Sequence, residues 1–211
     1  MIIAIDGPAA AGKGTLARRL AGHFGLAILD TGLLYRAVGM NLVRDGHDPD
    51  DAESAEAVAK ALKPEDLEAG DLRDEAAADA ASRVSAIPGV RKALLKFQRK
   101  FAENPPAGAK GAVLDGRDIG TVVCPSADVK LFVTASVEVR AERRFKELRE
   151  RGLDAIHGRV LADMKDRDAR DRERAVSPLE PAEDAYQLDT SDRDADQAFA
   201  AALGFINSGN H

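Results

Sequence analysis

A glycine-rich segment near the N-terminus has the residue spacing of a phosphate-binding loop. Gly7, Gly12 and Lys13 follow the Walker A pattern Gly-x4-Gly-Lys. In such a loop, consecutive backbone N–H groups curl around phosphate oxygens, and the helix that follows contributes partial positive charge from its N-terminus. Gly12 allows close approach of the backbone, and Lys13 is a mobile cation that can follow a transferring phosphoryl group. The residues expected to contact phosphate are Gly7, Pro8, Ala9, Ala10, Ala11, Gly12, Lys13, Gly14 and Thr15.

The end of this loop departs from the commonest pattern in a way that concerns the metal. Ser or Thr usually follows the lysine directly and binds magnesium, whereas here Gly14 follows it and Thr15 comes one position later. This ending is typical of nucleoside monophosphate kinases, in which magnesium is held largely through water. Asp30 and Asp115, at the ends of two expected strands, are candidates to hold the ion in that way. Each could instead cap a helix or hydrogen-bond within a loop, so the sequence does not identify the direct metal ligands.

Two further segments place arginines where a second phosphate would have to bind. Thr31 and Arg36 follow one expected strand, and Arg117 and Asp118 follow another. Folds built on parallel strands bind ligands at the carboxyl edge of the sheet. An arginine there can hold a phosphate through two parallel hydrogen bonds, and an adjacent aspartate can accept hydrogen bonds from a base amino group. The alternative for Arg117-Asp118 is a loop salt bridge, which on a surface contributes ~0–1 kcal/mol.

The charged segment 165–174 allows two interpretations. Acid-before-base pairs four residues apart would stabilise a solvated helix by ~0.2–0.5 kcal/mol each. These pairs are Asp163/Arg167, Asp166/Arg170 and Asp168/Arg172. Alternatively, Arg167, Asp171 and Arg174 share one helix face, and two arginines with a carboxylate suit a phosphate and a ribose hydroxyl. Spacing alone does not decide between the two.

Short apolar runs alternate with helical patterns, which indicates an α/β fold with a parallel sheet. The apolar runs predict five strands, at 2–5, 26–29, 112–114, 129–133 and 185–188. The helical patterns predict helices over 13–25, 32–44, 136–151 and 194–207, the third of them capped by Ser136.

Residues 45–109 fit this alternation poorly and are interpreted as an all-helical insertion. It includes a helical stretch over 83–103, with Pro88 and Gly89 inside it. We therefore expect one domain over 1–211, with a core of 1–44 and 110–211.

Charge is unevenly distributed along the chain. The formal net charge is −6, which argues against a protein that coats DNA. Residues 45–81 contain thirteen Asp/Glu and three Lys/Arg, whereas residues 140–174 contain nine Asp/Glu and twelve Lys/Arg. The second segment is therefore locally basic.

Other features exclude several classes of protein. The single cysteine, Cys124, excludes an internal disulfide, and with four scattered histidines it argues against a structural zinc site. We expect Cys124 to be a buried, inert thiol. The N-terminal residues lack a signal-peptide pattern, and no apolar run approaches the ~18–20 residues that span a bilayer. The expected compartment is the cytoplasm.

Together these segments resemble the bacterial cytidylate kinases, within the P-loop nucleoside monophosphate kinase family. The resemblance covers nearly the whole chain. It is carried by the segments Asp6-Gly7-Pro8…Gly12-Lys13-Gly14-Thr15, Asp30-Thr31-Gly32-Leu33-Leu34-Tyr35-Arg36, Asp115-Gly116-Arg117-Asp118-Ile119-Gly120-Thr121-Val122-Val123 and Arg167-Asp168-Ala169-Arg170-Asp171-Arg172-Glu173-Arg174-Ala175-Val176.

The resemblance implies a P-loop kinase fold: a five-stranded parallel sheet flanked by helices, an NMP-binding insertion at 45–109 and a mobile lid at 150–176. Bacterial family members usually carry a small antiparallel sheet in the insertion. Residues 60–75 are too short and too polar for it, so the insertion is expected to be helical.

The resemblance also implies an activity, the transfer of the γ-phosphoryl group of ATP to CMP or dCMP, with Mg²⁺. By motif, Ser82, Arg91 and Asp118 would read cytosine, and Arg167 and Asp171 would hold the ribose. The residues implied around the acceptor phosphate are Arg36, Arg117 and Arg174, with Thr31 lining the site. Those implied near ATP are Arg143 and Arg144, and those implied in catalysis are Lys13, Arg117, Arg167 and Arg174. The expected partners are these small molecules, with no nucleic acid or membrane, and the expected state is a monomer.

Other functions stay open from the residues alone. The nearest alternative is a P-loop kinase for another small acceptor, such as UMP, AMP or shikimate. A nucleotide-gated module that binds RNA through residues 140–174 is disfavoured by the interleaved acids and by the scarcity of aromatic side chains. A GTPase switch is disfavoured because no Asn-Lys-x-Asp segment is present.

Overall fold

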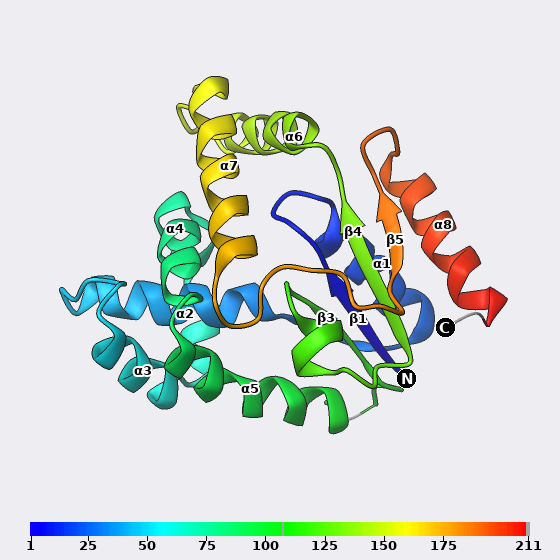
Figure 1. Cartoon of the computed structure of the whole chain (residues 1–211), viewed down its shortest axis with the longest axis horizontal. Helices are drawn as coiled ribbons and strands as arrows, with labels where there is room; N and C mark the ends of the chain where they lie inside the picture. Colours follow the sequence, from blue (N-terminus) through cyan, green and yellow to red (C-terminus); the bar gives the residue numbers. More distant parts are fainter. Residues whose placement is uncertain (107, 210–211) are drawn as a thin grey trace.

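The computed structural model, which describes residues 1–106 and 108–209, contains a five-stranded parallel sheet in the order β2-β3-β1-β4-β5 (Figure 1). The strands are β1 Ile2–Asp6, β2 Ala27–Asp30, β3 Ala112–Asp115, β4 Val129–Thr134 and β5 Tyr186–Asp189. Continuous apolar runs suit strands that are covered on both faces. The predicted α/β fold and the positions of all five strands are confirmed to within two residues.

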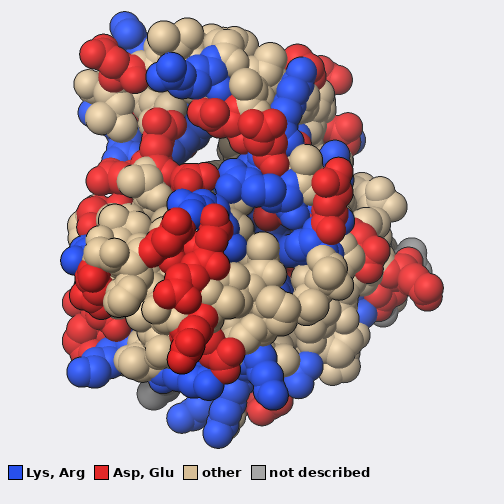
Figure 2. Space-filling view, turned by 60° about the vertical axis from the view of Figure 1, so that its left-hand side comes forward, with Lys and Arg blue, Asp and Glu red and all other residues tan. Residues whose placement is uncertain are grey.

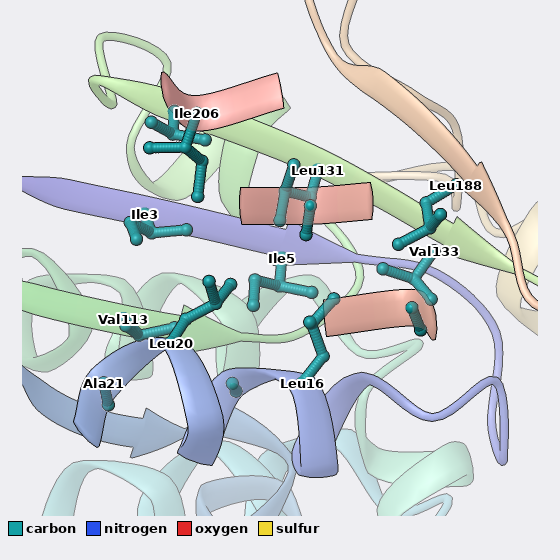
Figure 3. Packing of buried hydrophobic residues seen from close by; sticks show 14 of the residues in the cluster. Ile3, Ile5, Leu16, Leu20, Ala21, Val113, Leu131, Val133, Leu188 and Ile206 are labelled. Carbon is teal, nitrogen blue, oxygen red and sulfur yellow. The ribbon is translucent and has the colours of Figure 1, made fainter. Parts of the chain in front are cut away.

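Two helices cover one face of the sheet, α1 Lys13–Phe24 and α8 Ala195–Ser208. Figure 3 shows Leu16 and Leu20 of α1 pointing toward the sheet residues Ile5 and Val113. Burial of apolar side chains stabilises such a layer by ~25 cal/mol per Å². Gly25 ends α1 with a φ of 68°, a left-handed conformation that favours glycine. This packing fixes the direction in which the start of α1 points.

The predicted helical insertion is confirmed in the described residues of 45–109, which contain helices and no strand. Helix α2 Thr31–Arg44 leads into it, followed by α3 Ala52–Ala61, α4 Glu75–Val84 and α5 Pro88–Glu103. Two short 3-10 turns, Pro64–Glu68 and Gly70–Arg73, lie where family members were expected to have a small sheet. The expected helical stretch over 83–103 is wrong at its start, because α4 ends at Val84 and a new helix begins at Pro88. Proline suits the first turn of a helix, because the N–H groups of that turn have no partner within the helix.

Helices α6 Val137–Glu150 and α7 His157–Glu173 follow β4. Ser136 caps α6 as predicted, accepting a hydrogen bond from the Val139 N–H at 3.3 Å. Figure 1 shows α7 running beside α4, so two segments far apart in sequence face each other in front of the strand ends. No helix in the described residues is long and apolar enough to cross a membrane.

Candidate active site

The phosphate-binding loop connects β1 to α1 and contains three residues with positive φ. Gly7 and Gly12 have φ values of 142° and 93°, and Ala10 also lies in the left-handed region at 59°. A Cβ on Gly7 would lie 1.9 Å from the Val133 carbonyl oxygen, so only glycine fits there. A Cβ on Gly12 would meet nothing within 4 Å, so this glycine is required for its φ and borders open space. Of these residues only Ala10 carries a Cβ, so it alone is strained, by ~1–3 kcal/mol, as is common in ligand-binding loops.

Lys13 is buried beneath this loop. Its Nζ donates to the Pro8 carbonyl at 2.9 Å and lies 3.8 Å from Asp115 Oδ1. Burial, and next the positive charge of Arg117, lower the pKa of Lys13 to about 8. The protein therefore stabilises the charged form of Lys13 only weakly, and a bound anion such as phosphate would stabilise it further.

Carboxylates end three adjacent strands at this edge of the sheet. The register places Ile5 beside Asp115 and Asp30 beside Asp115, so the Asp6, Asp30 and Asp115 side chains follow neighbouring strand ends. Asp30 caps α2 by accepting from the Gly32 N–H at 3.0 Å. Burial raises the pKa of Asp115 despite the nearby Lys13.

Asp6 is a site residue that sequence reasoning missed. Its two carboxylate oxygens accept from the Ile119 N–H at 2.8 Å and the Gly120 N–H at 2.7 Å. It thereby holds the turn that follows Arg117 and Asp118. Burial raises the pKa of Asp6 to about 7. The available signal was a carboxylate directly at the end of a strand buried on both faces.

A small polar pocket of about 50 Å³ lies beside the loop, between the insertion and α7. It brings together nearly all of the residues expected to bind the acceptor. Its lining includes Thr31, Ser82, Arg91, Arg117, Asp118, Arg167, Asp171 and Arg174. Thr31 donates through Oγ1 to the Asp115 carbonyl at 2.8 Å, which ties the start of α2 to the end of β3.

Ion pairs across this pocket join different elements. Arg91 of α5 hydrogen-bonds Asp118 after β3, and both are buried. Arg117 Nε donates to Asp171 Oδ2 of α7 at 3.0 Å. The expected alternative of an Arg117–Asp118 loop salt bridge is therefore wrong, because each residue pairs with a partner on another element.

The expected acid–base pairs along α7 are also not the pairs that form. Asp168 pairs with Arg140 of α6, and Arg170 donates to Asp79 of α4 at 3.2 Å. Arg167, which spacing paired with Asp163, lines the pocket instead. One face of α7 packs against its neighbours, with Val160, Met164, Asp168 and Asp171 buried, and charged residues pair with those neighbours instead of along the helix.

Four donor atoms around the pocket are buried without a hydrogen-bond partner. They are Ser82 Oγ, Arg91 Nε, Arg167 Nε and Arg174 NH2. A buried unsatisfied polar group costs about 1–3 kcal/mol. Four of them in one place indicate a site shaped for a ligand rich in hydrogen-bond acceptors.

The charge balance of the pocket favours an anion. Burial, then Arg117, lowers the pKa of Arg167 to about 10, and burial, then Arg91, lowers that of Arg174. Burial alone would raise the pKa of Asp171, but Arg117, Arg167 and Arg174 together lower it. The arginines therefore repel one another, and an added phosphate would relieve that repulsion.

A larger cleft of about 630 Å³ opens from the pocket toward the loop. Figure 2 shows a hollow on this face, with Lys and Arg side chains gathered at it and acidic side chains around them. Arg36, Arg144 and Arg167 line the cleft with Ala9 and Ala10 of the loop. Arg36 donates to the Leu72 carbonyl at 2.7 Å and so lies in this cleft rather than in the pocket with Arg117 and Arg174.

A separate cavity of about 240 Å³ lies on the other side of the loop, bordered by Gly12 and Thr15. Arg143 lines it and donates to Thr190 Oγ1 at 3.0 Å. Arg144 does not line it and pairs with Glu147 at 2.8 Å. Of the two arginines expected near ATP, Arg143 thus borders the loop and Arg144 borders the central cleft.

Tyr35 is a second residue that the site assignments left out. Its ring lines the pocket, with the Arg91 guanidinium 5.5 Å from the ring centroid. It was visible within the segment 30–36, but nothing in the spacing showed that its ring would turn inward. Cys124 is buried as predicted, and burial raises its pKa to about 11. Among the described residues no group of three or more His, Cys, Asp or Glu could hold a metal ion.

A phosphate-binding loop at the carboxyl edge of a parallel sheet, together with an arginine-rich pocket, defines a P-loop kinase. A solved structure of an uncharacterized protein from Eubacterium ventriosum shares this fold, with a TM-score of 0.56 at 19% identity over 99% of this chain and 98% of that one. A sugar kinase from Janibacter sp. HTCC2649 is similar at a TM-score of 0.50 and 15% identity, over 98% of this chain and 94% of that one.

Sequence comparison narrows the class. The family model described as cytidylate kinase matches residues 3–208. A cytidylate kinase of Paramagnetospirillum magneticum is 72% identical over 98% of both chains, and one of Rhodospirillum rubrum is 62% identical over 98% of this chain and 97% of that one. The chain belongs to the cytidylate kinase family.

Proposed function

We propose that this protein transfers the γ-phosphoryl group of ATP to CMP or dCMP, giving CDP or dCDP and ADP. The observation that carries the proposal is the acceptor pocket, in which Ser82, Arg91 and Asp118 converge from three separate elements. The relatives named above are cytidylate kinases, so family membership agrees with the pocket. Kinases for UMP, AMP or shikimate are not favoured.

The base-reading role of the pocket follows from its donors and acceptors. Cytosine presents an amino donor at N4, which a carboxylate accepts well. We assign this contact to Asp118 and assign the ring acceptors of cytosine to Arg91 and Ser82, whose Nε and Oγ are buried and unpaired. Uracil would place a carbonyl against the Asp118 carboxylate, and a site built around a hydrogen bond rejects an analogue that cannot make it.

The remaining residues divide between ribose, phosphate and transfer. We assign Arg167 and Asp171 to the ribose, and Arg36, Arg117 and Arg174 to the acceptor phosphate. Phosphoryl transfer needs positioning and charge stabilisation more than proton abstraction, so no general base is assigned. Lys13, Arg117, Arg167 and Arg174 would stabilise the charge of the transferring group.

The ATP side is assigned to the loop of residues 7–15 and to Arg143. The loop's N–H groups and the start of α1 would bind the phosphates. Arg143 and Thr190 border the cavity beyond Gly12, where the nucleoside part would lie. Arg144 lines the central cleft with Ala9 and Ala10, so we assign it to the phosphates of ATP.

Magnesium fits the oxygen atoms that surround the loop. Hard carboxylate and hydroxyl oxygens suit this ion, and the described residues offer no cluster of three that would bind it without ATP. Asp30 and Asp115 would hold it through water, together with phosphate oxygens. Bound there, it would neutralise charge on the phosphates.

We also infer that the insertion 45–109 and the lid 150–176 move relative to the core. The acceptor pocket, at about 50 Å³, is smaller than the ~300–1,000 Å³ of a typical ligand cavity, so we expect these segments to separate when CMP enters. Closure over both substrates would then exclude water and prevent hydrolysis of ATP.

Substitution of Asp118 tests the base-reading role. Asp118→Ala should raise the KM for CMP by about 10²-fold or more and leave the KM for ATP nearly unchanged, because only CMP loses a hydrogen-bond acceptor. Steady-state kinetics with each substrate varied in turn measures both constants. Equal effects on the two substrates would remove Asp118 from this role. The matched control is Asp128→Ala, because Asp128 is exposed and its carboxylate lies 3.9 Å from the N-terminal ammonium of Met1.

A further inference from the structure

A buried ion pair joins α6 to α7 outside the residues assigned to the substrates. Arg140 NH1 and NH2 donate to the two carboxylate oxygens of Asp168, at 3.0 and 2.5 Å. Arg140 is 2% exposed and Asp168 is 6% exposed. Burying two charges costs desolvation that their attraction barely repays, so a pair of this kind is weak evidence for stability and calls for another explanation.

The same guanidinium also binds the phosphate loop. Arg140 Nε donates to the Ala135 carbonyl at 2.9 Å, and NH1 donates to the Ala9 carbonyl at 3.3 Å. Ala135 follows β4, and Ala9 precedes the strained Ala10 of the loop. One side chain therefore fixes three segments that are far apart in sequence: the phosphate loop, the exit of β4 and helix α7.

Asp168 lies on α7 between residues that we assign to the substrates. It follows Arg167 directly and precedes Asp171 by about one turn. The apolar contacts of α7 with α6, through Val160 and Met164, hold the two helices together but have no directional preference. The two hydrogen bonds to Arg140 do have one, and so do the ion pairs of Arg170 and Asp171 described above. The Arg140 bonds lie directly next to Arg167, so they would orient that residue toward the pocket.

We propose that Arg140 and Asp168 are positioning residues that couple the phosphate-binding loop to α7. Through them, the geometry of the loop that would hold ATP and the geometry of the helix that would hold the acceptor are set together. The inference rests on the proposed function, because it assumes that loop and helix serve the two substrates of one transfer. A misplacement of ~1 Å at such a site can lower the rate ~10²-fold.

The first test uses Arg140→Lys, which keeps the charge but cannot make the same set of four hydrogen bonds. The kcat for CMP should fall about 10²-fold while both KM values change less than about threefold, because alignment is lost and the substrate contacts remain. Arg19→Lys is the matched control, since Arg19 pairs with Asp196 between α1 and α8 at 2.7 Å, away from the site. A kcat for Arg140→Lys within about twofold of that of the control would overturn the proposal.

The second test separates positioning from stability. Asp168→Asn should lower both kcat and the urea midpoint, because it leaves the Arg140 charge without its partner. In Arg140→Met/Asp168→Leu no lone charge stays buried, so the urea midpoint should recover. If kcat stays low in this double variant, the pair acts by positioning. If kcat recovers together with the midpoint, the pair is only structural and the proposal fails.

Assays of the wild-type protein distinguish failure of the proposed function from failure of the proposed coupling. If it phosphorylates none of the acceptors tested, the proposed function fails whatever the variants do. If it phosphorylates CMP and Arg140→Lys performs equally well, only the coupling fails.

Discussion

At the residue scale, the site depends on charged groups held in surroundings that do not satisfy them. Lys13 is buried beneath the loop, and its neighbours include two arginines, Arg117 and Arg167, that oppose its charge. Four donors around the acceptor pocket lack partners. Phosphates would supply the missing negative charge and hydrogen-bond acceptors. The same Lys and Arg nitrogen atoms would then bind the substrates and stabilise the transferring group.

Lys13→Ala gives the prediction that follows most directly from this arrangement. The substitution should lower kcat by about 10³-fold or more, because it removes a cation that we assign to the transferring group, and it should leave CMP binding largely intact. A coupled ADP-release assay measures turnover, and titration calorimetry measures CMP binding. Lys60→Ala, at an exposed lysine paired with Glu56, is the control. Normal turnover in Lys13→Ala would contradict the assignment of residues 7–15 as the phosphate loop.

Asp6 gives a prediction about pH. Its pKa is raised from 3.8 to about 7 in the folded protein, so the folded state holds this proton more tightly than the unfolded state. Its contribution to stability is therefore complete below pH 3.8 and is lost as the pH rises toward 7. Across that interval the loss is at most ~4 kcal/mol, at 1.36 kcal/mol per pKa unit.

Asp6→Asn removes the titrating group and should flatten this dependence. Urea unfolding of both proteins at pH 5 and pH 7.5 isolates the effect, because all other groups titrate alike in the two. We expect the wild type to lose more stability than the variant between these two values. Equal losses would show that Asp6 is already ionised at the lower pH.

At the scale of elements, the acceptor side of the site depends on the contact between helices α2 and α4. Helix α2 carries Thr31 and Arg36, and α4 carries Ser82, so the packing of α2 against α4 sets how far apart these side chains lie. Gly39 permits that packing, because a Cβ there would lie 2.7 Å from Ala80 Cβ. The spacing of the acceptor side therefore depends on one small residue.

Gly39→Ala should force the two helices apart. We expect a loss of about 1–3 kcal/mol in the free energy of unfolding, together with a higher KM for CMP and an unchanged KM for ATP. Gly204→Ala, on the open side of α8, meets nothing within 4 Å and should stabilise the protein by about 0.5–1 kcal/mol. Urea titration and steady-state kinetics on both variants check this, and a stabilised Gly39→Ala would contradict it.

Patterns within elements were predictable, whereas contacts between elements were not. The apolar runs predicted all five strands, and the glycine spacing predicted the loop. The partners of Asp118 and Asp168 were not predictable, since Arg91 and Arg140 lie 27 and 28 residues away in sequence. Spacing can propose only near neighbours, such as Arg117 or Arg172. The start of α5 was misplaced because Pro88 was taken as lying inside a helix.

At the scale of the whole molecule, the net charge of −6 conceals a division of charge. The basic segment 140–174 contributes Arg144, Arg167 and Arg170 to the lining of the central cleft, and the acidic segment 45–81 contributes Glu75 and Asp79. Figure 2 shows both signs of charge around this hollow. Arg170–Asp79 and Arg151–Asp74 ion pairs join the two across the cleft. Small polyanions would therefore meet local arginines, not the average charge of the protein.

Acceptor selectivity tests the central claim most directly. The purified protein is assayed for ADP release with ATP, Mg²⁺ and each of CMP, dCMP, UMP, AMP and shikimate. We predict that kcat/KM for CMP or dCMP exceeds that for every other acceptor by about tenfold or more. Against UMP the reason is that Asp118 accepts a hydrogen bond from the cytosine amino group, which uracil lacks. If UMP or AMP is phosphorylated as efficiently as CMP, the assignment of the pocket to cytosine is contradicted.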